Sequence, residues 1–115
     1  MSNPIEYAGI YWVSFTPSVG HEYQGRRPAV VIQSDRSLKK GNLATVMPLT
    51  SQIGKSHSTD ILVKQSSKNK LYGDSLVKVQ SIQSFDRTRF IKRIGLMEDS
   101  VMKKVQTYLK EHFDL

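Results

Sequence analysis

Residues 15–33 read FTPSVGHEYQGRRPAVVIQ, a turn-rich polar segment that leads directly into an apolar run. Proline and glycine punctuate the first half, whereas the second half ends in Ala29–Ile32. A short apolar run bounded by turn signals is typical of a buried strand, and Pro28 is tolerated at the first residue of such a strand. The sequence therefore predicts a polar, cationic loop leading into a rigid strand, a place where binding and catalytic groups tend to lie.

On both sides of this segment, short apolar runs alternate with polar turns. Strands are expected at Gly9–Phe15, Leu43–Leu49, Asp60–Val63, Ser75–Ile82 and Phe90–Ile94, with Gly95 closing the last. One helical turn is expected within residues 34–42. A helix is predicted at the C-terminal end, where apolar residues recur every three or four positions: Val101, Met102, Val105, Tyr108, Leu109 and Phe113. We expect a single domain over residues 1–115, of the α+β or mainly β class, as a small barrel with a packed helix.

The chain is basic and contains no cysteine. Its 115 residues carry 17 Lys and Arg against 10 Asp and Glu, a formal charge of +7. Such a balance favours a polyanionic partner, nucleic acid before a membrane surface. No apolar run approaches the roughly 20 residues of a membrane span, and no signal peptide opens the sequence, so a cytoplasmic protein is expected. Disulfides and thiolate metal sites are excluded.

Metal-dependent chemistry has little support in the sequence. The three histidines are scattered, the acidic residues form no cluster, and phosphate-binding or dinucleotide glycine patterns are missing. The candidates that remain are polar and cationic: His21, Glu22, Arg26, Arg27, Thr50, Ser51 and Gln52. RNA offers a route that needs only such groups, because its 2′-hydroxyl can attack the adjacent phosphate. A solvated loop histidine and ordinary surface arginines are the alternative interpretation.

Five segments together resemble the MazF/PemK (Kid) family of bacterial toxins. They are GIYWV at 9–13, PSVGHEYQGRRPAVVI at 17–32, PLTSQ at 48–52, GDSLV at 73–77 and IKRIG at 91–95. The resemblance implies an SH3-like β-barrel with helices, assembled as a homodimer. It also implies an endoribonuclease, or mRNA interferase, that cuts single-stranded RNA without metal or cofactor and leaves a 2′,3′-cyclic phosphate and a 5′-hydroxyl. The partner implied is an antitoxin whose acidic, flexible tail blocks the RNA groove.

The resemblance also assigns roles to individual residues. Arg27, directly before Pro28, matches the family's catalytic arginine, and Thr50 matches its catalytic threonine. His21 matches the histidine proposed as the base in the PemK branch. Groove contacts to RNA are expected from Glu22, Gln24, Arg26, Ser51, Gln52, Lys78, Gln80 and Gln83. Without the resemblance, Thr50 would satisfy backbone groups at a strand end, and Glu22 would neutralise a neighbouring arginine.

Three positions depart from the family pattern. Lys78 and Gln80 stand where the PemK branch places an arginine and an aspartate in its chemistry. Lysine keeps the charge but loses the bidentate fork, and glutamine cannot act as an acid or base. Gln83 stands where many members have arginine, a change expected to alter which bases are read. The departures at Lys78 and Gln80 favour Arg27 and Thr50 as the main catalytic groups, with His21 assisting.

Other side chains receive ordinary roles at this point. Trp12 is expected to pack in the core, with base stacking as the alternative. Four lysines, Lys64, Lys68, Lys70 and Lys92, are expected to be solvated surface charge. Two other functions remain open: a CcdB-type toxin that binds DNA gyrase and cuts nothing, and an RNA-binding module with weakened catalysis.

Overall fold

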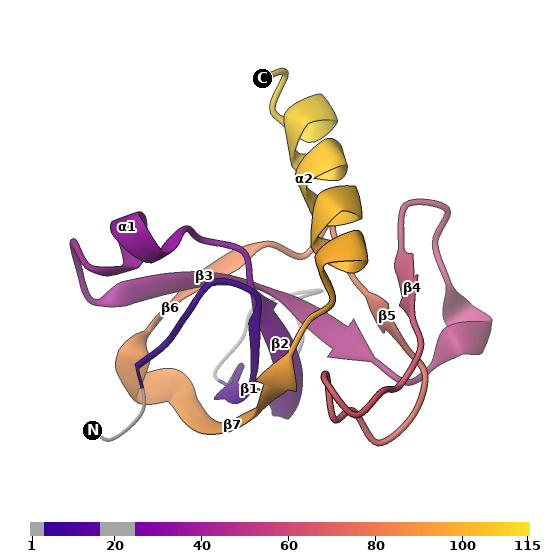
Figure 1. The fold of residues 1–115 in the computed structure, drawn as a ribbon, viewed down its shortest axis with the longest axis horizontal. Helices are drawn as coiled ribbons and strands as arrows, with labels where there is room; N and C mark the ends of the chain where they lie inside the picture. The colour runs from indigo at the N-terminus through magenta and orange to yellow at the C-terminus, as the bar shows by residue number, and fades with distance from the viewer. Residues whose placement is uncertain (1–3, 17–24) are drawn as a thin grey trace.

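The computed structural model describes residues 4–16 and 25–115 and consists of one antiparallel β-sheet with a C-terminal helix (Figure 1). The strands are β1 (Gly9–Ser14), β2 (Arg26–Val31), β3 (Leu43–Thr50), β4 (Ile61–Val63), β5 (Ser75–Val77), β6 (Gln83–Asp86) and β7 (Phe90–Leu96). The helices are α1 (Asp35–Leu38) and α2 (Asp99–His112), with 3₁₀ turns η1 (Ile53–Lys55) and η2 (Arg87–Arg89). The mainly β class with a C-terminal helix is thus confirmed.

The strands follow the spatial order β4-β5-β3-β2-β1-β7, and β6 also pairs with β3. Among the described residues this hydrogen-bonded path ends at β4 and at β7, so the sheet curves without closing. The long strand β3 is central, because β6 pairs with its first half and β5 with its last two residues.

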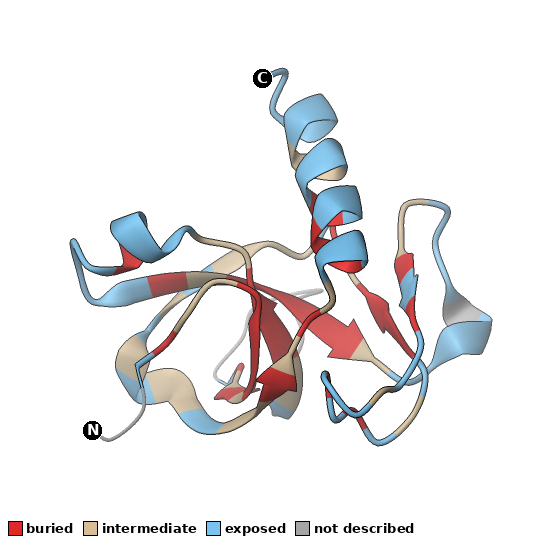
Figure 2. Cartoon of the chain, in the orientation of Figure 1, coloured by how far each residue is buried: buried red, intermediate tan, exposed pale blue. Residues whose placement is uncertain are grey.

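The core consists of two apolar clusters. One includes Val30, Met47 and Val77, and α2 covers it with Val101, Met102 and Val105. The other gathers around Val13, Phe15 and Val31. Buried residues concentrate on the strands and on the inner side of α2, whose outer side is exposed (Figure 2). This is the amphipathic pattern that the sequence predicts for the helix, although Phe113 lies beyond its last turn and is 54% exposed.

The strand predicted over Ser75–Ile82 is wrong in its second half. Val77 pairs with Leu49 in β5, whereas Gln83 pairs with Val46 in β6. Between these two pairs the segment has five residues, whereas β3 has only two. The extra residues cannot pair with β3 and form a turn, in which the N–H of Ser81 donates to the carbonyl of Lys78 (3.0 Å). Apolar residues alternate across the turn, which is why the sequence pattern looks continuous.

Gly95 does not close the last strand as predicted, because β7 continues through it to Leu96. Its Cα faces the backbone of the segment between β4 and β5. A Cβ at this position would lie 2.3 Å from the carbonyl oxygen of Asn69. Glycine is needed here because another backbone passes within contact distance of the strand.

Pro28 lies inside β2 and not at its first residue as predicted. It is opposite Trp12 of β1, and the β2–β3 ladder begins one residue later, at Ala29. Proline is therefore tolerated because the ladder toward β3 has not yet begun at this residue.

Candidate functional site

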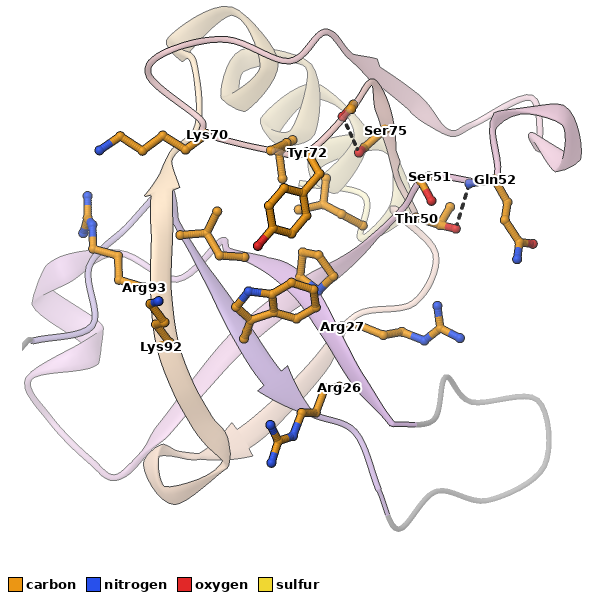
Figure 3. A pocket seen from close by; sticks show the side chains of 16 residues that line it. Arg26, Arg27, Thr50, Ser51, Gln52, Lys70, Tyr72, Ser75, Lys92 and Arg93 are labelled. Carbon is orange, nitrogen blue, oxygen red and sulfur yellow. Dashed lines mark hydrogen bonds between the residues drawn. The ribbon is translucent and has the colours of Figure 1, made fainter.

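A cavity of about 420 Å³ lies at the ends of β2 and β3, where several predicted site residues meet (Figure 3). Strands β1, β2, β3 and β7 form its floor, and the segment between β4 and β5 forms one wall. The lining residues are Trp12, Arg26, Arg27, Pro28, Leu49, Thr50, Ser51, Gln52, Lys70, Leu71, Tyr72, Gly73, Ser75, Lys92, Arg93 and Ile94. The structure therefore brings together five residues predicted from sequence: Arg26, Arg27, Thr50, Ser51 and Gln52.

The cavity is strongly cationic. Its described lining contains five basic side chains and no carboxylate: Arg26, Arg27, Lys70, Lys92 and Arg93. Arg93 is partly neutralised, since its guanidinium pairs with Glu6 and lies 6.0 Å from the ring centre of Tyr11. A groove lined by one sign of charge concentrates ligands of the opposite sign.

Arg27 and Thr50 lie on adjacent strands and line the same cavity. The β2–β3 ladder ends at the pair of Ala29 with Pro48, so Arg27 lies two residues before the ladder and Thr50 two residues after it. Figure 3 shows the Arg27 side chain extending toward the end of β3, while Arg26 points to a different part of the rim. A guanidinium and a hydroxyl from adjacent strands thus border the same space.

Thr50 also organises the end of its own strand. Its hydroxyl oxygen accepts a hydrogen bond from the backbone N–H of Gln52 (3.2 Å). The strand-end role expected without the family resemblance is therefore present. This bond uses a lone pair and leaves the hydroxyl hydrogen available to donate to a ligand. Ser51 and Gln52 follow directly and are exposed at the rim.

The wall between β4 and β5 is held by a polar network beneath it. The Asn69 side chain is completely buried; its amide donates to the Lys64 carbonyl (2.9 Å) and to the Glu98 carboxylate (3.0 Å). Ser66 donates to the other oxygen of Glu98 (2.5 Å). Partial burial raises the pKa of Glu98, but the hydrogen bonds from Ser66 and Asn69 outweigh it, so the pKa lies below its usual value. The ionised carboxylate therefore fixes this wall.

Sequence reasoning missed several residues of the site. Lys70 and Lys92 line the cavity, although surface charge alone was expected of them. Trp12 is half-buried and lines the cavity, so the expectation of a fully packed core residue is wrong. The sequence analysis assigned no role to Tyr72, which lines the cavity and is 90% exposed. Trp12 pairs with Lys92 across β1 and β7, and this neighbour relationship, which places both residues at the cavity, can be seen only in the folded structure.

Lys78, Gln80 and Gln83 do not line the cavity. The Lys78 ammonium pairs with Asp60 (2.5 Å), whose side chain is only 3% exposed. The same carboxylate oxygen accepts the backbone N–H of His57 (2.7 Å), so Lys78 balances a nearly buried charge in the preceding segment. Gln80 lies in the turn between β5 and β6, and Gln83 begins β6.

Three further predicted site residues, His21, Glu22 and Gln24, lie outside the described residues. The described residues on either side of them are joined by two hydrogen bonds. The N–H of Phe15 donates to the Gly25 carbonyl (2.8 Å), and the N–H of Gly25 donates to the Thr16 hydroxyl (2.7 Å). This junction lies next to Arg26, at the rim of the cavity.

The described part of the chain contains neither a cluster of metal-ligating side chains nor a membrane-spanning helix. There, no three His, Asp or Glu side chains gather into a group that could hold a metal ion. None of the described helices has the length and apolar character needed to cross a membrane. The arrangement that remains is a cationic cavity with a threonine, suited to a phosphate-rich ligand.

Comparison with known proteins gives a consistent result. The family model for PemK-like, MazF-like toxins of type II toxin–antitoxin systems matches residues 6–113. Endoribonuclease MazF of Staphylococcus saprophyticus is 30% identical over 96 residues, which cover 84% of this chain and 80% of the relative. The crystal structure of MazF (Form-I) from Deinococcus radiodurans has a TM-score of 0.81 at 24% identity, with 96% of each chain covered. The MazE-MazF (Form-III) structure from the same organism has a TM-score of 0.78 at 22% identity, covering 98% of this chain and 99% of that one.

Proposed function

This chain belongs to the PemK-like, MazF-like toxins of type II toxin–antitoxin systems, and we propose that it is an endoribonuclease that binds single-stranded RNA in the cationic cavity. The observation that carries the proposal is the lining itself. Among the described residues, five basic side chains and no carboxylate line the space that Arg27 and Thr50 border. The curated relative from S. saprophyticus carries the name endoribonuclease, which supports the same activity.

The proposed reaction is an internal transfer at phosphorus. The 2′-oxygen of one nucleotide forms a bond to the adjacent phosphorus, and the bond from phosphorus to the 5′-oxygen of the next nucleotide breaks. The 2′-hydroxyl loses its proton to a base, and the leaving 5′-oxygen gains a proton. The products are a 2′,3′-cyclic phosphate and a 5′-hydroxyl, and no metal takes part in these steps.

Arg27 is proposed to stabilise the extra negative charge on the phosphoryl oxygens, since a guanidinium can contact two of them at once. The Thr50 hydroxyl is proposed to donate a hydrogen bond to the same group. His21 is proposed as the base that accepts the 2′-hydroxyl proton, because imidazole titrates near neutral pH. The hydrogen bond from Phe15 to Gly25 supports this assignment, because it joins the described residues on either side of the segment that contains His21, and Gly25 directly precedes Arg26.

Other residues are proposed to hold the RNA strand. Arg26, Ser51 and Gln52 line the cavity and can contact phosphate or sugar oxygens. Glu22 and Gln24 keep their predicted roles in the groove, as do Lys78, Gln80 and Gln83. The cavity gives the last three no support, because none of them lines it.

Two protein partners are part of the proposal. The solved MazE-MazF complex from D. radiodurans supports an antitoxin, which here would bring an acidic, flexible tail into the cationic cavity. A second copy of this chain would complete a two-fold symmetric homodimer. A mass measurement at micromolar concentration should give the dimer, and a monomer alone would reject that assembly.

Incubation of the purified protein with a long RNA in excess EDTA tests the function. We expect fragments with 5′-hydroxyl and cyclic phosphate ends, identified by end-labelling before and after kinase and phosphatase treatment. The Arg27→Ala variant serves as the control against a contaminating nuclease. RNA binding without cleavage would indicate the weakened RNA-binding module. Neither binding nor cleavage, together with inhibition of gyrase, would indicate the CcdB-type function.

A further inference from the structure

Two aromatic side chains meet at the cationic cavity, and one of them is almost fully exposed. Tyr72 is 90% exposed, and its ring centre lies 6.4 Å from that of Trp12, with the planes tilted by 43°. Figure 3 shows the Tyr72 side chain among the residues that line the cavity. An exposed aromatic ring that lines a cavity can contact a ligand there, because its flat face is available for stacking.

The backbone around Tyr72 is anchored on both sides. Before it, Leu71 is buried and donates its N–H to the Asn69 side chain (3.1 Å). After it, the Gly73 carbonyl accepts from the Ser75 hydroxyl (3.0 Å), and the Asp74 carboxylate accepts from the N–H of Gln65 (2.9 Å). The ring is therefore presented by a fixed segment, so a ligand that covers it loses little binding free energy to ordering.

Charges near these rings match a strand of nucleotides. Lys92 is the partner of Trp12 across β1 and β7, and Lys70 lies two residues before Tyr72. Both lysines line the cavity, whose described lining contains no carboxylate. Flat aromatic faces beside basic side chains are the arrangement by which proteins hold single-stranded nucleic acid, with bases on rings and phosphates on cations.

We propose that Trp12 and Tyr72 form a base-stacking subsite that binds one unpaired nucleobase of the RNA strand beside Arg27 and Thr50. The proposal rests on the proposed function and adds a residue to it, since Tyr72 contributes to RNA binding and not to bond cleavage. Stacking uses the ring face, so the Tyr72 hydroxyl is dispensable and any base is accepted, with larger purines favoured.

The test uses a short RNA that contains a mapped cleavage site and carries a 2′-O-methyl group at the cleaved ribose, so that it binds without being cut. Its dissociation constant is measured by fluorescence anisotropy. Tyr72→Ala should weaken binding roughly 5- to 100-fold, the range for loss of one base–aromatic stack. Tyr72→Phe should bind within about twofold of wild type. Phe113→Ala, an exposed aromatic outside the cavity lining, should leave binding unchanged.

A series of RNAs with one abasic position each locates the stacked base. One position should weaken wild-type binding strongly and leave Tyr72→Ala binding almost unaffected, which is the coupling expected of direct contact. Trp12 is the single tryptophan in the chain, so its fluorescence reports the subsite directly. The intact RNA should quench it, and the RNA lacking the stacked base should quench it less.

Equal binding by wild type and Tyr72→Ala would overturn the proposal, as would additive losses at every abasic position. Loss of antitoxin binding without loss of RNA binding would also overturn it and assign the rings to a protein ligand. Failure of the proposed function is separate, because it is measured as absent cleavage of unmodified RNA by the wild-type protein. In that case unmodified RNA binds without being cut, and the same anisotropy measurements on it decide whether the rings stack on a base.

Discussion

Arg27 and Thr50 line the same cavity, each two residues beyond the pair of Ala29 with Pro48 at which the β2–β3 ladder ends. The two residues are 23 positions apart in the sequence, and the pairing of β2 with β3 brings them together. Arg27 pairs with Val13 of β1 and Thr50 pairs with Leu76 of β5, so sheet pairing fixes the backbone at both residues. This geometry suits a charge-stabilising group that must be in place before the reaction begins.

Replacing Arg27 by alanine should lower the single-turnover cleavage rate by at least about 10²–10³-fold, the usual effect of removing one such donor. Arg27→Lys should restore little activity, because an ammonium lacks the two-pronged geometry. The measurement is cleavage of a short RNA at saturating enzyme, with thermal unfolding to verify the fold. Arg26→Ala is the matched control and should weaken binding with a smaller effect on the saturated rate. Cleavage by Arg27→Ala at the wild-type rate would reduce Arg27 to a binding or structural role.

RNA affinity should fall as salt rises, since the basic cavity displaces counterions from phosphates. Lys92→Ala should lower the slope of log affinity against log salt by about one if Lys92 contacts a phosphate. Lys103→Ala, an exposed lysine on α2 outside the cavity, is the control and should leave the slope unchanged. Affinity that does not vary with salt would contradict a cavity that tracks the RNA backbone.

Gly95→Ala should destabilise the fold by about 1–3 kcal/mol, the usual cost of overpacking. The new Cβ would meet the Asn69 carbonyl oxygen at 2.3 Å, and that atom belongs to backbone that cannot simply rotate away. Gly41→Ala is the matched control, because its Cβ would have no heavy atom within 4 Å. Urea unfolding measures both variants. Equal stability of Gly95→Ala and wild type would mean that the Asn69 segment shifts freely, contrary to its hydrogen bonding.

Acid should loosen the wall that carries Tyr72. Glu98 has a lowered pKa in the folded protein, so its ionised form contributes stability above the ordinary glutamate pKa of about 4.3. That contribution declines as the pH falls below this value and is lost once the pH passes the folded pKa. The free energy of unfolding should therefore fall less steeply with acid in Glu98→Gln than in wild type. Glu111→Gln, an exposed position on α2, should follow the wild-type slope.

Much of the frame could be predicted from sequence because its signals are local. The apolar run after Pro28, the strand around Trp12 and the 3–4 residue spacing of α2 each describe one element. The break between β5 and β6 could not be predicted, since it arises because five residues lie between two pairs that are separated by only two residues on β3. Gly95 is required because the backbone of Asn69, which is distant in sequence, lies against it, and no local sequence pattern indicates this contact.

The candidate site could also be predicted only in part. Arg26, Arg27 and Thr50 were found from a segment resemblance, and the fold brings them together. Lys92 and Tyr72 could not be found, because each joins the cavity through neighbours distant in sequence. Lys78 is the opposite case. The sequence predicts that it contacts RNA, whereas in the structure it forms a salt bridge with Asp60.

The hydrogen bonds that join Phe15 and Thr16 to Gly25 have a consequence for how such a protein diversifies. They join the ends of β1 and β2 directly, on either side of the eight positions 17–24. Each doubling of the number of residues between two joined ends costs only about 0.6 kcal/mol in closure entropy. Insertions, deletions or transplanted segments are therefore expected to be inherited there without refolding the sheet. Substrate choice can then drift between lineages while the scaffold is conserved.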